Sequence, residues 1–547
     1  MRTAVLFASV LACVGLLAAC ESCKSPRTPE GDGAAAISPP DARLYLVSDL
    51  AGALEPCGCV KDQLGGMDHF GALVATEKKT APAFVTVSSG PLFFMDMEVA
   101  EERKNQELAK ARTIAAAMKT LELAAFAPSR NGFLGGPGEL DELRATSGAA
   151  MLAANVTGAP GATKSKLVTI GKLKVGLIGV AAPDKAEHVT TPLEGITSAP
   201  AAPAVKEAAA ALTKDGAQVL VALAAVGRGE AKRIADEVPE LTAILVGSTG
   251  ARGDENTKPA PPERIGDVLV VETANHLQTV GVLDLHLRDD AGAGGLVRFA
   301  DGTGLDRMRK REELNGRIDE LRGKIAQWEG DKSVAAKDVA DRKADVARLE
   351  GERDALDKAP PPKTGSFFRY SMREIRDQLG VDEAVKSQMN AFYKKVNDEN
   401  KIAFKDKKPP PVAKGQPAYV GVDMCTNCHE EPRNVWDKTK HATAYPTLEK
   451  DFKEANLDCV SCHVTGYDKP GGSTVTHVAD LKNVQCEVCH GPGSLHAADP
   501  KAKIPVARPG PEMCLECHHP PHVHVFDPKA KMADILGPGH GRPLAQK

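Results

Sequence analysis

Four copies of one short motif dominate the last quarter of the chain. Each copy has two cysteines three positions apart and a histidine directly after the second: Cys425, Cys428 and His429; Cys459, Cys462 and His463; Cys486, Cys489 and His490; Cys514, Cys517 and His518. Two thiols at this spacing can add to the two vinyl groups of one haem, and the adjacent imidazole then reaches the iron. The motifs predict four covalently attached c-type haems with these histidines as proximal iron ligands.

Zinc is the competing occupant, because paired cysteines also build tetrahedral zinc sites. Zinc does not explain the histidine that follows every pair. The N-terminus, described below, indicates export to an oxidising compartment, which disfavours free thiolates. We therefore expect haem at these four motifs.

Further histidines lie in the same region at a high density for a chain with 15 in all. They are His441, His477, His496, His519, His522, His524 and His540. Each proximal histidine leaves the sixth position of its iron open, and a second imidazole can fill it. We expect most of these side chains to bind iron or to support a ligand, with a solvated imidazole as the alternative for any single one.

The sequence around the motifs resembles the tetrahaem cytochrome c-554 family. The resemblance covers about residues 418–545, and the strings at 425–441, 462–467 and 486–496 carry it. It implies a mostly α-helical and irregular multihaem domain. It also implies that three histidines are distal iron ligands, namely His441, His496 and His540, and that the haem on His463 remains five-coordinate. His519, His522 and His524 compete with His540 for the last of these roles.

The chain opens with a segment typical of an exported lipoprotein. An apolar run over 4–19 is shorter than the ~20 residues needed to cross a bilayer, and it ends in small residues before Cys20. The ending resembles a bacterial lipobox, which implies cleavage before Cys20 and acylation of its sulfur. We expect a signal peptide at 1–19, a flexible tether at 20–41, and a lipid-anchored location in the bacterial cell envelope. The chain would face the periplasm, with the outer membrane favoured, or lie at the cell surface; a buried apolar helix is the alternative.

From 42 to 300, short apolar runs alternate with Ala-rich amphipathic stretches. Runs typical of buried strands lie at 44–47, 84–87, 174–180, 218–223, 242–246 and 267–271. Helical periodicity covers 101–124 and 205–215. This alternation predicts an α/β domain in a multidomain chain.

The sequences of these predicted strands resemble those of the calcineurin-like metallophosphoesterases of the 5'-nucleotidase family. The resemblance implies a metallophosphoesterase-like α/β sandwich. The stretches that carry the resemblance are 47–52, 64–66, 152–156, 176–184 and 244–250. Most metal-ligand positions of that family are changed here: Ala51 replaces a histidine, and other substitutions lie at 89–91, 130–133, 224–227 and 248–250. Asp49 and Asn131 alone are too few for a two-metal hydrolase. We expect a degenerate scaffold and not a phosphoesterase.

Two more cysteines, Cys57 and Cys59, follow the first predicted strand with one glycine between them. Such a pair can close a strained disulfide with a labile potential. One hypothesis is a redox-active pair that exchanges electrons with a substrate or with the haems. The other is a structural bridge, which can involve Cys23.

Residues 304–358 have the period of paired helices. Leu314, Ile318, Leu321, Ile325 and Trp328 are spaced by four and three residues, as in the seam of a coiled coil. A Gly-Asp turn at 330–331 predicts an antiparallel coiled-coil hairpin, with a homodimer through the same seam as the competitor. We expect a helical linker at 365–411, including a helical stretch at 371–400, before the haem region.

Three functions fit these features. Basic and acidic residues nearly balance, at 69 and 73, so no strong field favours nucleic acid. The first function is electron transfer by a membrane-anchored multihaem cytochrome, with periplasmic or membrane redox proteins as partners. The second is an oxidoreductase acting on a small nitrogen or sulfur compound at a five-coordinate haem or at Cys57 and Cys59. The third is a non-catalytic binding module.

Overall fold

The computed structural model describes most of the chain from residue 38 onwards. The described residues are 38–56, 63–253, 255–288, 295–329, 334–356, 362, 364–519, 523, 526–537 and 540. The predicted signal peptide, the lipid site at Cys20 and the cysteines Cys23, Cys57 and Cys59 lie outside them, as do His522 and His524. No helix in these described ranges is both long enough and apolar enough to cross a membrane.

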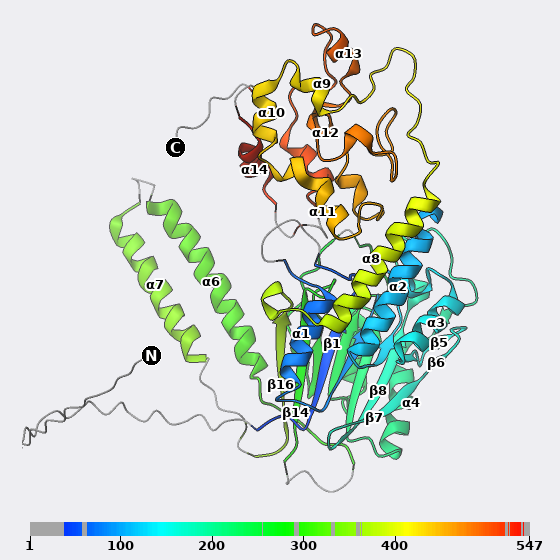
Figure 1. The fold of residues 1–547 in the computed structure, drawn as a ribbon. Coiled ribbons are helices and arrows are strands. Elements are labelled where there is room, and N and C mark those ends of the chain that lie inside the picture. Colours follow the sequence, from blue (N-terminus) through cyan, green and yellow to red (C-terminus); the bar gives the residue numbers. More distant parts are fainter. Residues whose placement is uncertain are drawn as a thin grey trace, which may run out of the picture. The chain divides into compact units, whose positions relative to one another are not determined.

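A larger sheet forms one layer of the α/β part (Figure 1). Its strand order is β15-β16-β14-β1-β2-β3-β4-β6. β1 pairs in parallel with β2 and antiparallel with β14. The strands are β1 (Ala42–Ser48), β2 (Phe84–Ser89), β3 (Leu123–Ala127), β4 (Ala150–Leu152), β6 (Ala162–Thr163), β14 (Thr279–His286), β15 (Ala300–Asp301) and β16 (Phe367–Glu374).

A second sheet lies behind the first and has the order β12-β13-β11-β10-β8-β7. β8, β10, β11 and β13 pair in parallel, as expected for strands joined through helices. The strands are β7 (Ser165–Ile170), β8 (Leu173–Ala181), β10 (Val219–Ala225), β11 (Ala243–Gly247), β12 (Glu263–Ile265) and β13 (Val268–Val271). The short strands β5 (Val156–Thr157) and β9 (Thr197–Ser198) pair separately.

The alternation of side chains along β1 explains why the two sheets stack. Leu44 and Leu46 point into the apolar layer between the sheets, whereas Tyr45 and Val47 point to the opposite face. That outer face packs against helices α1 (Met67–Glu77), α2 (Glu101–Thr120), α3 (Pro137–Ser147) and α8 (Glu383–Ala403). Helices α4 (Ala201–Lys214) and α5 (Arg228–Glu237) cover the second sheet. The α/β expectation is confirmed as a two-sheet sandwich between helical layers.

Two helices follow β15 and pack against each other, α6 (Leu305–Glu329) and α7 (Ala336–Ala355). Ile318 and Ile325 of α6 are buried with Val346 and Leu349 of α7. Residues of the predicted seam on α6 thus pack against α7 of the same chain (Figure 1).

The predicted helical linker at 365–411 is wrong over its first part. Residues Phe367–Glu374 form β16, which pairs antiparallel with β14 along its whole length. Strand pairing with β14 outweighs local helical preference here. The helix that follows, α8, lies on the sandwich, because Val385, Met389 and Val396 belong to the core shared with α1 and α2. The α/β part thus extends well past residue 300.

The remaining residues form short helices joined by turns. They are α9 (Val422–Thr426), α10 (Glu430–Trp436), α11 (Ala444–Lys450), α12 (Cys486–His490), α13 (Ser494–Ala498) and α14 (Pro528–Ile535). A small apolar core joins Phe404, at the end of α8, to Tyr445, Leu457 and Val460. The region is stabilised by turns and side-chain hydrogen bonds more than by an apolar interior.

Candidate functional site

Each described cysteine motif is wound into a single turn. The His429 N–H donates to the Cys425 carbonyl at 3.0 Å, and the His518 N–H donates to the Cys514 carbonyl at 2.8 Å. In such a turn, residues three and four apart lie on the same face. Both thiols of a motif and the histidine that follows can therefore bind the same ligand.

Two motif histidines each face a histidine that is distant in the sequence and outside the motifs. The ring centroids of His429 and His496 lie 6.3 Å apart, with 28° between the ring planes. Those of His441 and His518 lie 6.2 Å apart, with 40° between the planes. Each pair joins a proximal histidine predicted from a motif to a histidine predicted as distal.

His540 lies near both His490 and His429. Burial lowers the pKa of His540, and the nearby imidazoles of His490 and His429 lower it further. The Nδ1 atom of His540 is buried and has no hydrogen-bond partner among the described residues. His540 therefore lies beside a proximal histidine with a polar atom still to be satisfied.

His463 differs from His429 and His518, each of which faces another histidine. No ring contact between His463 and another histidine occurs within the described residues. Burial lowers its pKa, so the ring is neutral at neutral pH, the form that binds metal. Its Nδ1 lies 2.7 Å from the Ala444 carbonyl oxygen, which leaves Nε2 as the nitrogen available to a metal.

Backbone carbonyls orient other rings in the same way. Nδ1 of His490 lies 2.9 Å from the Val506 oxygen, and Nδ1 of His496 lies 2.8 Å from the Ala502 oxygen. A hydrogen bond at one ring nitrogen fixes the tautomer and directs the other nitrogen toward a metal. These carbonyl groups therefore orient the histidine rings, and the sequence alone did not predict them.

The cysteines of different motifs meet in pairs. The Cys425 side chain lies close to that of Cys486, and the Cys462 side chain lies close to that of Cys517, so that within each pair the two thiols shift each other's pKa. The first motif thus lies against the third, and the second against the fourth. Within the described residues, no three His, Cys, Asp or Glu side chains gather as a metal-ion cluster.

Glu487, inside the third motif, is a structural residue that the sequence reasoning missed. Its carboxylate is 1% exposed and accepts hydrogen bonds from the backbone N–H groups of Val420, Gly421 and Gly493, at 2.7–3.1 Å. These bonds fasten the first motif and the turn before His496 to the third motif. A glutamate between two cysteines carries no signal of this role, because its partners are distant backbone groups.

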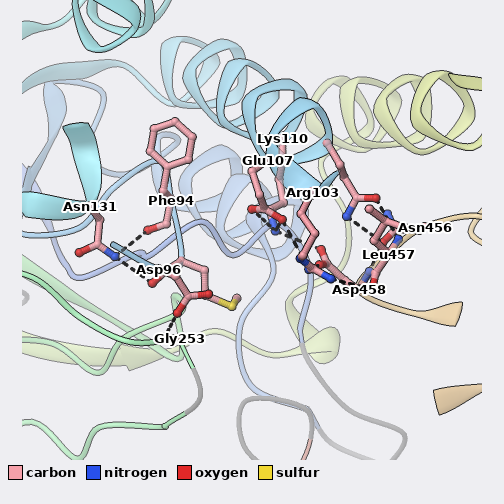
Figure 2. Close-up of polar contacts among 12 residues, drawn as sticks. Phe94, Asp96, Arg103, Glu107, Lys110, Asn131, Gly253, Asn456, Leu457 and Asp458 are labelled. Carbon is pink, nitrogen blue, oxygen red and sulfur yellow. Dashed lines mark hydrogen bonds and ion pairs between the residues drawn. The ribbon is translucent and has the colours of Figure 1, made fainter. Parts of the chain in front are cut away.

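Asp49 and Asn131, the two side chains kept at predicted metal-ligand positions, both form hydrogen bonds within the α/β part. The Asp49 carboxylate accepts a hydrogen bond from the Ser248 N–H at 3.0 Å, and burial raises its pKa to about 7. The Asn131 amide donates to the carbonyl of Phe94 (Figure 2) and to those of Met95 and Ala251. Both side chains that survive from the family's ligand set are used for internal hydrogen bonds.

Several solved structures of low sequence identity are similar to the chain. They include a sulfate thiohydrolase of Thermus thermophilus in complex with glycerol, with 16% identity, a TM-score of 0.37 and coverage of 45% of this chain and 54% of that one. A 5'-nucleotidase precursor of the same species has 16% identity, a TM-score of 0.43 and coverage of 74% and 68%. For a calcineurin-like phosphoesterase of Bacillus subtilis the values are 18%, 0.38, 46% and 87%.

The C-terminal region is similar to c-type cytochromes in sequence. Cytochrome c-554 of Nitrosomonas europaea is 34% identical over 91 residues, a match that covers 14% of this chain and 39% of that cytochrome. The chain thus spans about two fifths of the length of this relative. Residues 424–491, which hold three of the four motifs, match the family described as cytochrome c554 and c-prime.

Proposed function

We propose that this chain transfers electrons through four covalently bound haems. The observation that best supports this proposal is the distance between the two ring centroids within each facing imidazole pair, 6.3 Å in one pair and 6.2 Å in the other. An iron ion held by two imidazole nitrogens, each about 2 Å away, separates the ring centroids by roughly 6 Å. The described residues therefore fit bis-histidine haem iron without rearrangement of either pair.

We assign distal ligands to three haems, two of them on the basis of the facing imidazole pairs. His496 serves the haem attached at Cys425 and Cys428, and His441 serves the haem at Cys514 and Cys517. The position of His540 beside His490 supports it as the distal ligand of the third motif. A bis-histidine iron cycles between its oxidised and reduced states without exchanging a ligand, which suits electron transfer.

The contacts between motifs support a close approach of the haems within two pairs. Because Cys425 touches Cys486 and Cys462 touches Cys517, the haems they attach are neighbours in two pairs. Covalent attachment at both vinyl positions holds each porphyrin at its own motif. Close, fixed cofactors are what a relay between a donor and an acceptor requires.

A second candidate function is favoured by His463, which has no facing imidazole within the described residues. The iron bound there keeps an open position and can bind a small nitrogen or sulfur compound. The chain is then an oxidoreductase whose other haems supply or remove electrons. The pair Cys57 and Cys59, outside the described residues, stays a prediction as a second redox site.

The location and partners belong to the same proposal. Cys20 carries lipid, the folded part stands in the periplasm or at the cell surface, and soluble or membrane redox proteins exchange electrons with it. Replacing Cys20 by alanine is expected to release the chain from the membrane fraction. Retention of Cys20→Ala in that fraction contradicts the anchor.

The decisive experiment is a haem count with spin-state assignment on the purified full chain. We expect four haems by pyridine haemochrome absorbance, three low-spin and one high-spin by electron paramagnetic resonance. Binding of nitric oxide or hydroxylamine to the high-spin haem, followed by turnover, favours the oxidoreductase. A chain without Soret absorption contradicts both functions.

A further inference from the structure

Helices α2 and α8 of the α/β part bind the backbone of the segment that leads into the second motif. Asn397 accepts from the Ala455 N–H at 2.9 Å, and Asn400 donates to the Ala455 carbonyl at 2.9 Å. Gln106 accepts from the Leu457 N–H at 2.9 Å, and Arg103 donates to the Leu457 carbonyl at 3.0 Å. Four side chains therefore satisfy both backbone groups of both residues, as a sheet partner would.

The contact between α2, α8 and the segment at 455–458 forms a junction that also contains ion pairs, as Figure 2 shows. Lys110 lies in the middle of α2, 6% exposed, with Nζ 2.9 Å from the Glu107 carboxylate and 3.1 Å from the Asp458 carboxylate. Arg103 pairs with the same Asp458. Burial alone would lower the pKa of Lys110, but the two carboxylates outweigh it and raise the pKa. Two cations thus face two carboxylates, one of which comes from the haem region.

The junction is directly connected to the second motif. Asp458 immediately precedes Cys459, and the N–H groups of Cys459 and Val460 donate to the Asn456 carbonyl at 3.1 and 3.0 Å. Asn456 is 2% exposed and hydrogen-bonds to Gln106. The turn that carries Cys459 and Cys462 therefore starts from residues that α2 holds.

We propose that Arg103 and Lys110, through Asp458, are positioning residues for the haem bound at Cys459, Cys462 and His463, and that their charges set its reduction potential. The inference rests on the proposed function, since it requires a haem at this motif. It assigns a task to the α/β part: α2 holds the segment directly before the second motif, whose histidine, His463, faces no other imidazole within the described residues. The other described motifs make no comparable contact with α2.

The charges predict shifts of opposite sign for two single substitutions. Asp458→Asn removes a negative charge beside the haem, which disfavours the more positive oxidised iron and raises its potential. Lys110→Met removes a positive charge and lowers the potential. Each change is expected to alter the ratio of reduced to oxidised haem about tenfold, which is ~59 mV for one electron. The double variant is expected to return toward the wild-type value.

The test uses the full chain with all haems attached and a spectroscopic redox titration. The high-spin signal reports the His463 haem, and the low-spin signals report the other three. Lys119→Met, at the exposed end of α2, and Asp451→Asn, exposed in the same segment, are the matched controls and are expected to leave every potential unchanged. Hydrogen exchange at Ala455 and Leu457 checks whether the segment stays docked in each variant.

The outcomes separate this inference from the proposed function. Opposite shifts confined to the high-spin haem support the inference. Shifts of the same sign in both single variants would mean that the docked segment has only loosened, and they overturn the inference. Unchanged potentials, or equal shifts at all four haems, overturn it as well. A variant and a wild type that both lack four haems contradict the proposed function instead.

Discussion

The imidazole rings of His441 and His518 lie 6.2 Å apart, although one follows the first cysteine motif and the other completes the fourth. Burial lowers the pKa of His441, and the neighbouring His518 lowers it further. Burial and the neighbouring His519 likewise lower the pKa of His518, so both rings are neutral at physiological pH and able to share an iron. This one contact joins the two ends of the haem region.

The equivalent contact of the first motif gives a direct prediction. His496→Ala removes the ring that faces His429, so the iron at that motif loses its distal ligand. We expect four haems to remain attached, while one of three low-spin signals converts to high-spin. Electron paramagnetic resonance of the oxidised protein measures the change.

His477→Ala is the control, because His477 lies in the same region and its Nδ1 lies 3.3 Å from the Thr476 hydroxyl. It is expected to leave all spin states as they are. An unchanged low-spin count in His496→Ala would show that His496 is not an iron ligand.

The second motif can be removed separately. Replacing Cys459 and Cys462 together by serine is expected to lower the pyridine haemochrome count from four to three and to abolish the high-spin signal. Nitric oxide binding at that haem is lost with it. Ser461→Ala, between the two cysteines, is the control and keeps four haems. Loss of a low-spin signal instead assigns the open position to another motif.

The buried Asp49 predicts a pH-dependent stability of the α/β part. Its pKa is about 7 in the folded chain against 3.8 as the ordinary value, because burial penalises the carboxylate. Between these pH values the folded state holds a proton that the unfolded state has lost, so stability falls as pH rises through this window. Asp49→Asn cannot ionise and keeps the hydrogen-bond acceptor.

We therefore expect Asp49→Asn to match the wild type near pH 4 and to exceed it above pH 7. One pKa unit corresponds to about 1.4 kcal/mol, so the gain is at most about 4 kcal/mol. Urea unfolding followed across pH values measures it. Asp215→Asn, at an exposed helix end, is the control; a constant difference between Asp49→Asn and wild type at all pH values contradicts the assignment.

The hairpin of α6 and α7 predicts a local effect. Ile318 is 1% exposed and packs against α7, so Ile318→Ala is expected to cost about 2–5 kcal/mol of packing within the hairpin. Hydrogen exchange should accelerate in α6 and α7 and stay unchanged in the sheets. Asp319→Ala, exposed on the same turn, is the control.

Sedimentation of the same variant tests the competing dimer. If the seam is satisfied within one chain, Ile318→Ala and wild type sediment as the same species. A wild-type dimer that dissociates in Ile318→Ala means that the seam joins two chains.

Local patterns predicted the elements of the sandwich well. The apolar run at 84–87 became β2 and the run at 174–180 became β8, because buried parallel strands read as continuous apolar segments. The helical period at 101–124 became α2. By contrast, β16 was predicted as part of a helical linker, since only its pairing with β14 determines its conformation.

The chemistry of the site was readable from spacing, but its geometry was not. A cysteine motif and its histidine are close in sequence, whereas the partner of His429 lies in α13 and that of His518 lies before α11. The role of Lys110 was hidden for the same reason: it occupies an ordinary position in a helix, and its partner Asp458 comes from the haem region. Long-range partners are determined by the tertiary fold.

The hydrogen bonds from side chains of α2 and α8 to the backbone of Ala455 and Leu457 also have a consequence for the order of folding. In a chain that folds from its N-terminus, both helices are complete before the cysteine motifs emerge. They then act as a template onto which the later polypeptide closes. A fragment beginning at residue 418 would lack both helices, and with them the side chains that hydrogen-bond to the backbone of Ala455 and Leu457.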